Sequence, residues 1–199
     1  MATPSIDVED YQTFIGDTIP DEKIAQCEAA IAQAIEWVGN QVGYPIVVYE
    51  ASPSTATKDT QVFSGNGGKD FYPRYYPIQD VDEIGLWDGV DSYDAIDETL
   101  YLTTTDENRV YFESGDVFAR GTNNWQIVYY YGWATAIPVD LKRAILHTVR
   151  MFMGVSTRDT SIQSQSDGEH SITYFKASDP QLPDEAIKII AKYRRFATI

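Results

Sequence analysis

The feature that most constrains the fold is a long stretch of strand pattern with helical pattern on both sides. From Ile46 to Gly132, apolar and polar residues alternate with period two, and turn residues recur about every eight to twelve positions. The flanking segments instead place apolar residues three and four positions apart, as amphipathic helices do. The sequence therefore predicts an α+β fold. The expected strands cover residues 46–50, 60–65, 81–87, 99–104, 109–113 and 124–133.

The N-terminal segment predicts two helices. A short one is expected to be capped by Ser5 or Asp7 and to end at Gly16, because glycine adopts the left-handed conformation that closes helices. A longer one begins near Pro20 and is stopped by Gly43. Its apolar stripe consists of Ile24, Cys27, Ile31, Ile35 and Val38.

The C-terminal segment predicts two more helices, which open at Pro138 and Pro183. The first has the strongest apolar stripe in the chain: Leu141, Ala144, Ile145, Thr148, Val149 and Phe152. This stripe and the earlier one are expected to pack against each other. We therefore predict a small bundle of three to four helices, built from residues 1–45 and 136–199, that carries a large β-rich insertion over residues 46–135.

Composition excludes several classes of protein. The chain has 199 residues, 30 of them acidic and 15 basic, and its net charge is -15. A protein that binds nucleic acid tightly needs a basic surface, which this composition does not provide. It has no apolar run of about 18 residues and no signal peptide, so no membrane association is expected. Its single cysteine, Cys27, excludes a disulfide framework and is interpreted as a core residue.

Motifs for chemistry are missing from the sequence. The glycine-rich stretch 64–70 has the wrong spacing for a phosphate-binding loop and is interpreted as a hairpin tip. The acidic loop 88–98 lacks the ligand order of a calcium-binding loop, and His147 has no second histidine or cysteine four residues later. His170 lies in the polar loop with Asp167 and Glu169, a pattern that suggests a titrating contact and no more. We therefore predict no catalytic residue, no metal, no cofactor and no enzymatic activity.

Two other functions stay open. One is a binding module for carbohydrate or a host surface, in which exposed aromatic residues of the β-rich segment form a platform. The residues concerned are Phe71, Tyr72, Tyr75, Tyr76, Trp87 and Trp125. The other is a carboxylate-dependent hydrolase, since two distant Asp or Glu residues can meet in a fold.

Four stretches of the chain, in this order, resemble the head–tail connector (adaptor) proteins of tailed bacteriophages. They are SIDVEDYQTFIGDTIPDEKIAQCEAAIAQAIEWVGNQVG, YYPIQDVDEIGLWDG, WQIVYYYGWATAIPVDLKRAILHTVRMFM and the closing region with GEHSITYF and AKYRR. The most recognisable is the third, in which an aromatic–Gly strand end precedes Ile-Pro-x-Asp-Leu-Lys-x-Ala. Short members of that family lack much of the β-rich segment.

The resemblance implies a virion structural protein of the neck, made in the cytoplasm of the bacterial host. Such proteins form a ring, typically a homododecamer, between the portal protein and a stopper or tail-completion protein. DNA passes through the channel without specific binding. The polar stretch 157–181 is expected to order only when the ring forms. The family has no catalytic residue, so the resemblance assigns none to this chain.

One basic cluster stands out in the acidic chain. It consists of Lys188, Lys192, Arg194 and Arg195, followed by Phe196. We predict that these residues form a partner interface that docks on the portal, because arginine and aromatic side chains are frequent anchors at interfaces. The alternative is that the cluster only complements the dipole of the last helix.

Overall fold

The computed structural model describes residues 6–49, 57–113, 115–156, 164–167, 170–173 and 182–194. The chain folds into two compact units, a β unit built on residues 44–137 and a helical unit built on residues 6–43 and 138–199. Helices and antiparallel sheets are both present, so the predicted α+β class is confirmed. None of the helices described has the length and apolar character needed to cross a bilayer.

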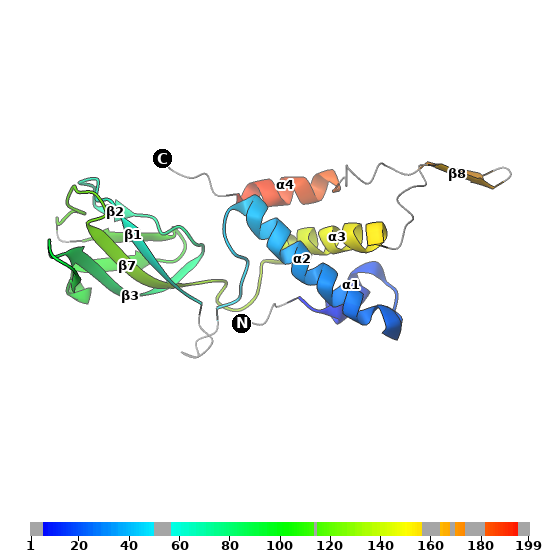
Figure 1. The fold of residues 1–199 in the computed structure, drawn as a ribbon, viewed down its shortest axis with the longest axis horizontal. Helices are drawn as coiled ribbons and strands as arrows, with labels where there is room; N and C mark the ends of the chain where they lie inside the picture. The colour runs from blue at the N-terminus through cyan, green and yellow to red at the C-terminus, as the bar shows by residue number, and fades with distance from the viewer. Residues whose placement is uncertain are drawn as a thin grey trace. The chain divides into compact units, whose positions relative to one another are not determined.

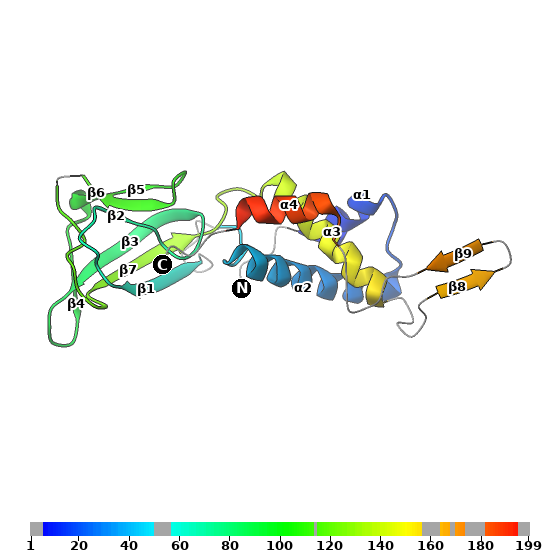
Figure 2. The same ribbon diagram turned by 90° about the horizontal axis from the view of Figure 1, so that it is seen from above.

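In the part of the chain that the structure describes, the helical unit contains four α-helices, which Figure 2 labels. They are α1 (Val8–Ile15), α2 (Ile24–Val42), α3 (Val139–Ser156) and α4 (Asp184–Tyr193), and a 3-10 turn, η1 (Asp21–Lys23), precedes α2. Asp7 caps α1 through a capping box with Asp10. Gly16 and Gly43 end α1 and α2 in the left-handed conformation, with φ of 70° and 91°.

The core of the helical unit lies where α2 and α3 pack together. The α2 face is buried at Cys27, Ala30, Ile31, Ala34, Val38 and Val42. The α3 face is buried at Leu141, Ala144, Ile145, Leu146, Thr148, Val149 and Met153. Ile35, expected on the buried stripe, is only half-buried, because the contact face of α2 runs through the small residues Ala30 and Ala34.

The described residues of the β unit form two antiparallel sheets (Figure 1). The larger has the order β1-β7-β3-β4, with β1 (Lys58–Phe63), β7 (Trp125–Tyr131), β3 (Ile78–Trp87) and β4 (Tyr93–Ala95). The smaller has the order β2-β6-β5, with β2 (Asp70–Phe71), β6 (Arg109–Phe112) and β5 (Tyr101–Thr104), and a 3-10 turn, η2 (Glu98–Leu100), leads into β5. Every second residue of β7 is buried, as the sequence pattern predicts for a strand with one inward face.

Aromatic rings fill the core of the β unit. Phe118, on the segment between β6 and β7, is 1% exposed, and its ring centroid lies 4.7 Å from that of Phe112 and 5.2 Å from that of Trp125. Phe63 and Phe71 stack on each other at 3.7 Å and complete the cluster. The interpretation of the abundant aromatic residues as sheet core is therefore confirmed.

Several local expectations were wrong. Residues 46–49 of the expected strand 46–50 do not form a strand: among them only Val48 forms a bridge, with Trp133, and residue 50 lies outside the described residues. The glycine-rich stretch 64–70 is not a hairpin tip, because β1 pairs with β7 whereas β2 pairs with β6. Its backbone instead bonds to Phe118 and Gly121. The short strands β2 and β4 were missed, since each lies inside a turn-rich stretch.

The polar stretch between α3 and α4 also contains a hairpin that was not predicted. It consists of β8 (Ser164–Asp167) and β9 (His170–Thr173), which pair antiparallel.

Candidate functional site

The predicted partner interface lies on and after α4. Pro183 precedes the helix, Asp184 and Glu185 occupy its first turn, and Lys192 lies in its last. Of the predicted residues, Lys188, Lys192 and Arg194 are all exposed. The other two, Arg195 and Phe196, lie outside the described residues.

Asp140 holds the end of α4 against the start of α3. Its carboxylate accepts a hydrogen bond of 2.7 Å from Nζ of Lys192 and one of 2.6 Å from the hydroxyl of Tyr193. Partial burial acts to raise the pKa of Asp140, but these two donors outweigh it and leave the pKa below its usual range. Burial and the same hydrogen bond raise the pKa of Tyr193 to about 12. Lys192 therefore has a partner within its own chain.

Arg194 joins α4 to the end of α2. Its Nε donates a hydrogen bond of 3.0 Å to the backbone carbonyl of Gln41, and its Nη2 donates one of 3.4 Å to the side-chain Oε1 of Gln41. The Gln41 carbonyl is one of the last four of α2, which have no partner inside the helix. Arg194 therefore caps α2, and its charge also complements the negative end of the helix dipole.

These contacts give a structural meaning to the motif Ile-Pro-x-Asp-Leu-Lys-x-Ala at the start of α3. Leu141 and Ala144 are fully buried in the helical core. Asp140 binds the end of α4, and Lys142 forms an ion pair of 2.8 Å with Asp10 in α1. The motif thus connects α3 to α4 through Asp140 and to α1 through Lys142.

Lys188 is different from Lys192 and Arg194. It is exposed on α4, and within the part of the chain that the structure describes it forms no ion pair. Of the basic residues of the predicted interface that the structure describes, it is the one without an ion pair or side-chain hydrogen bond to another described residue.

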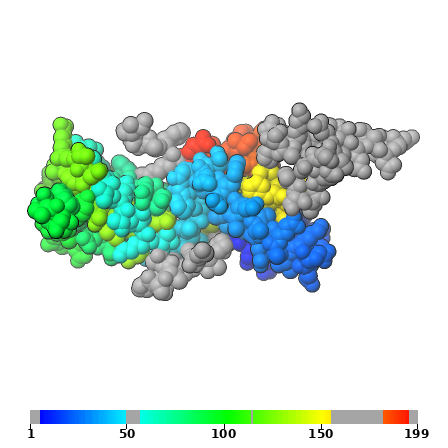
Figure 3. Space-filling model, viewed as in Figure 1, coloured from blue at the N-terminus to red at the C-terminus, as the bar shows by residue number. Residues whose placement is uncertain are grey.

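A groove with a volume of about 540 Å³ runs between α2 and α4. Both helices reach the surface in the space-filling view (Figure 3). Ile187, at the groove, leaves 51% of its surface exposed although it is large and apolar. The groove is lined by Trp37, Gln41, Leu182, Asp184, Ile187, Ile190, Ala191 and Arg194.

The chemistry of the groove is that of a contact surface. It contains one carboxylate, Asp184, and one cation, Arg194, at opposite ends of α4. Paired carboxylates, as the hydrolase alternative requires, do not line it. Among the described residues, no group of three histidine, cysteine, aspartate or glutamate side chains is placed to hold a metal ion.

The aromatic platform of the carbohydrate-binding alternative does not form. Trp125 is 4% exposed and donates its indole N–H to the carbonyl of Ala119, while Phe71 is half-buried and packs against the core. Tyr75 packs at the edge of that core. Of the six candidates, only Tyr72 and Trp87 expose more than a third of their surface, and Trp87 packs edge-on against Tyr93 at 5.2 Å.

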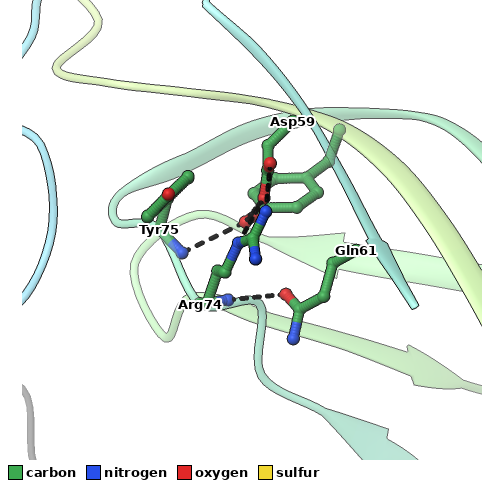
Figure 4. Close-up of polar contacts among 5 residues, drawn as sticks. Asp59, Gln61, Arg74 and Tyr75 are labelled. Carbon is green, nitrogen blue, oxygen red and sulfur yellow. Dashed lines mark hydrogen bonds and ion pairs between the residues drawn. The ribbon is translucent and has the colours of Figure 1, made fainter. Parts of the chain in front are cut away.

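A polar cluster in the β unit was missed by sequence reasoning (Figure 4). Arg74 contacts the carboxylate of Asp59 through Nε at 2.9 Å and Nη2 at 2.6 Å. The hydroxyl of Tyr129 donates to the same carboxylate at 2.9 Å and accepts the backbone N–H of Tyr75 at 3.1 Å. Burial raises the pKa of Tyr129, and the charge of Asp59 adds to the effect. The cluster fixes the segment before β3 onto β1 and β7.

The other residues considered for chemistry have structural roles. Asp88 accepts backbone N–H groups of Val90, Asp91 and Ser92, and these bonds hold the pKa of Asp88 below its usual range. The acidic loop is therefore a closed turn. His147 packs edge-on against Phe14 at 4.9 Å, and burial lowers its pKa. His170 begins β9, and nothing is described of its side chain.

Comparison with solved structures shows a shared fold. A chain from the neck of an empty gene transfer agent (GTA) particle, computed with C6 symmetry, has a TM-score of 0.64 at 13% identity, with 100% of this chain and 95% of that one covered. Chains from the neck of the native GTA particle, computed with C12 symmetry, and from the native GTA virion each have a TM-score of 0.61 at 12% identity. These two matches cover 100% of this chain and 94% and 95% of the other. No curated protein matches the sequence.

The sequence also matches a protein family over almost its whole length. The match covers residues 5–196, and the family is described as head completion protein. It confirms the predicted resemblance to phage head–tail connectors and the predicted structural role at the head–tail junction. The chain therefore belongs to the head completion protein family.

Proposed function

We propose that the protein forms a closed ring of twelve copies in the neck of a phage-like particle. The observation that carries this proposal is the family match over residues 5–196. The fold is also shared with chains of necks that were computed with C6 and C12 symmetry. In this proposal the portal lies on one side of the ring, a stopper or tail-completion protein lies on the other, and DNA passes through the centre.

The distribution of charge supports a conduit that does not hold DNA. Residues 44–137, which build the β unit, contain fifteen acidic and five basic residues, so they carry -10 of the net charge of -15. Each retained phosphate contact would slow the passage of DNA, and an acidic ring avoids such contacts. We propose that the role is structural and not enzymatic, which agrees with a groove lined by a single carboxylate.

We further propose that the exposed side of α4 and the residues after it face the portal. Lys188 is the test residue, because Lys192 and Arg194 already bind Asp140 and Gln41 and their loss would disturb the helical unit itself. Lys188→Glu should weaken binding to the portal by about tenfold. Lys23→Glu, at an exposed position in η1, is the matched control for charge and should leave binding unchanged. Equal binding by both variants would contradict the proposal.

Truncation after Arg194 tests the last part of the interface. This truncation removes Arg195 and Phe196 but keeps the contacts of Lys192, Tyr193 and Arg194 with α3 and α2. The truncated protein should fold with unchanged thermal stability and lose portal binding. Unchanged binding would exclude these two residues from the interface.

Electron microscopy of the protein mixed with its portal tests the ring. We expect a closed layer of twelvefold symmetry on the portal. Particles in which the protein binds as isolated copies, or does not bind, would refute the proposed function.

A further inference from the structure

The strand β4 is an edge of the larger sheet in the β unit (Figure 2). It is paired on one side, with β3. The chain is described without a gap from residue 79 to residue 100, so the strand and the segments on both sides of it are seen in full. Within the described residues, no strand pairs with the other side of β4.

Two main-chain hydrogen bonds show how β4 is oriented. Asp88 donates its N–H to the carbonyl of Ser92 at 3.0 Å, and Ile96 donates its N–H to the carbonyl of Ile84 at 2.8 Å. In an antiparallel ladder, residues bonded to the partner strand alternate with residues whose main-chain groups point the opposite way. Ser92, Asp94 and Ile96 therefore direct their main-chain groups toward β3.

The two other residues of β4, Tyr93 and Ala95, direct their main-chain groups to the open side of the sheet. Each presents one N–H and one C=O there. Within the described chain, none of these four groups has a main-chain partner. A row of unpaired main-chain groups at a sheet edge is where another strand can add to the sheet.

The surroundings of this edge are acidic. Residues 75–108 contain ten aspartate or glutamate residues and no lysine or arginine. Asp91, Asp94 and Glu98 are exposed and form no ion pair with a described residue. Like charges on adjacent strands are destabilising, which disfavours a second copy of β4, and phosphates are repelled in the same way. A strand with lysine or arginine opposite Asp94 is stabilised instead.

Apolar side chains beside the edge provide further contact area. Val90, at the tip of the hairpin that joins β3 to β4, is 78% exposed. Trp87 is 37% exposed and packs edge-on against Tyr93 at 5.2 Å. Apolar side chains with charged neighbours are typical of a surface that contacts another protein.

We propose that β4 is a docking edge for an extended, basic segment of another protein, which adds to the larger sheet as a fifth strand. The main-chain groups of Tyr93 and Ala95 bind the backbone of that segment. The carboxylate of Asp94 binds a lysine or arginine side chain in it. This inference goes beyond the proposed ring and does not require it, since it concerns an edge within a single copy.

Selection from a random library of nine-residue peptides against the full chain tests the edge. We expect the selected peptides to carry an excess of lysine and arginine. A synthetic peptide from the selection should protect the amides of Tyr93 and Ala95 from hydrogen exchange, which nuclear magnetic resonance measures residue by residue. A selection without binders, binders without a net positive charge, or binders that leave these two amides exchanging as in the free chain would each overturn the proposal.

Ala95→Pro tests the main-chain contact. Proline is tolerated on an edge strand where its N–H would face solvent, so the substitution removes the outward N–H and keeps the ladder with β3. It should weaken binding of the synthetic peptide by about tenfold. Ala95→Val keeps the N–H and is the matched control, which should bind within about twofold of the unmodified protein. If folded Ala95→Pro binds as tightly as Ala95→Val, the peptide does not add to this edge.

Asp94→Asn tests the charge without altering the backbone, and it gives an answer even if Ala95→Pro does not fold. It should weaken binding by about threefold, and the difference should shrink as salt is added. Asp106→Asn, at an exposed position in the turn between β5 and β6, is the matched control and should leave binding unchanged. Equal effects of the two variants would show that only the net charge attracts the peptide, against the proposal. All measurements use the isolated protein, so a negative result leaves the proposed function untouched.

Discussion

The hydroxyl of Tyr193 donates a hydrogen bond of 2.6 Å to Oδ1 of Asp140, and it thereby joins the end of α4 to the first turn of α3. The two residues are 53 positions apart in the sequence. The second oxygen of the same carboxylate accepts the Lys192 ammonium group. A neutral and a charged donor therefore share one acceptor, which allows their contributions to be compared directly.

Tyr193→Phe should destabilise the helical unit more than Lys192→Ala. The lost hydrogen bond to a charged, partly buried acceptor is worth about 1.5–3 kcal/mol. The Lys192 side chain is 65% exposed, so its ion pair should contribute less than about 1 kcal/mol. Urea denaturation, monitored through the circular dichroism signal of the helices, measures the loss of stability in both variants. A larger effect for Lys192→Ala would show that charge, and not the phenol, holds α4.

Asn108→Ala should be among the most damaging polar substitutions in the β unit. The side chain is buried, its Oδ1 accepts the backbone N–H of Ile78 at 2.7 Å, and its backbone has a φ of 51°. Loss of the acceptor leaves a buried donor unpaired, and alanine tolerates this φ poorly, for a total of about 2–5 kcal/mol. Asn123→Ala is the control, since Asn123 has a φ of 50° but an exposed side chain. Similar free energies of unfolding for the two variants would mean that the hydrogen bond contributes nothing.

Gly65→Ala should prevent the loop between β1 and β2 from closing. A Cβ at Gly65 would lie 1.9 Å from the carbonyl oxygen of Ala119, which belongs to the backbone and cannot rotate away. We expect a loss of about 2–4 kcal/mol, as for other overpacked sites. Gly89→Ala, where a Cβ has open space but φ is 88°, should cost only about 1 kcal/mol. If Gly89→Ala lowers the thermal stability more than Gly65→Ala does, the close approach of Gly65 to Ala119 does not determine the stability of this loop.

The stability of the protein should fall steeply at alkaline pH. Burial raises the pKa of Tyr131 to about 12 and also raises the pKa of Tyr129. In the unfolded chain both phenols titrate near pH 10, so above that pH the unfolded state binds fewer protons than the folded state. Stability is therefore retained below pH 10 and lost between pH 10 and 12, by up to about 1.4 kcal/mol per pH unit for each group. Urea midpoints measured across this range should decline less steeply in Tyr131→Phe, and an identical slope would contradict the assignment.

The helices could be predicted because their signals are local. Asp7, Gly16 and Gly43 are caps whose role depends only on the residues next to them, and the apolar stripe of α3 identifies its buried face without reference to a partner. The strands with strict alternation, such as β7, were found for the same reason. Strands of two or three residues such as β2 and β4 have too few residues to show a period.

The contacts that define the candidate site could not be predicted. Lys192 and Arg194 look like free cations in the sequence, because nothing local indicates that Asp140 lies beside one and the end of α2 beside the other. The same holds for Arg74 and Asp59, which meet only when the segment before β3 crosses β1. The groove between α2 and α4 likewise depends on how two helices that are distant in sequence pack together.

The two segments through which the chain enters and leaves the β unit run side by side at its base. Val48 forms a bridge with Trp133, whose N–H binds the carbonyl of Val47 and whose carbonyl accepts the N–H of Tyr49. Because the entering and leaving segments are hydrogen-bonded to each other, the β unit can be gained or lost during evolution while the order of the helices is preserved.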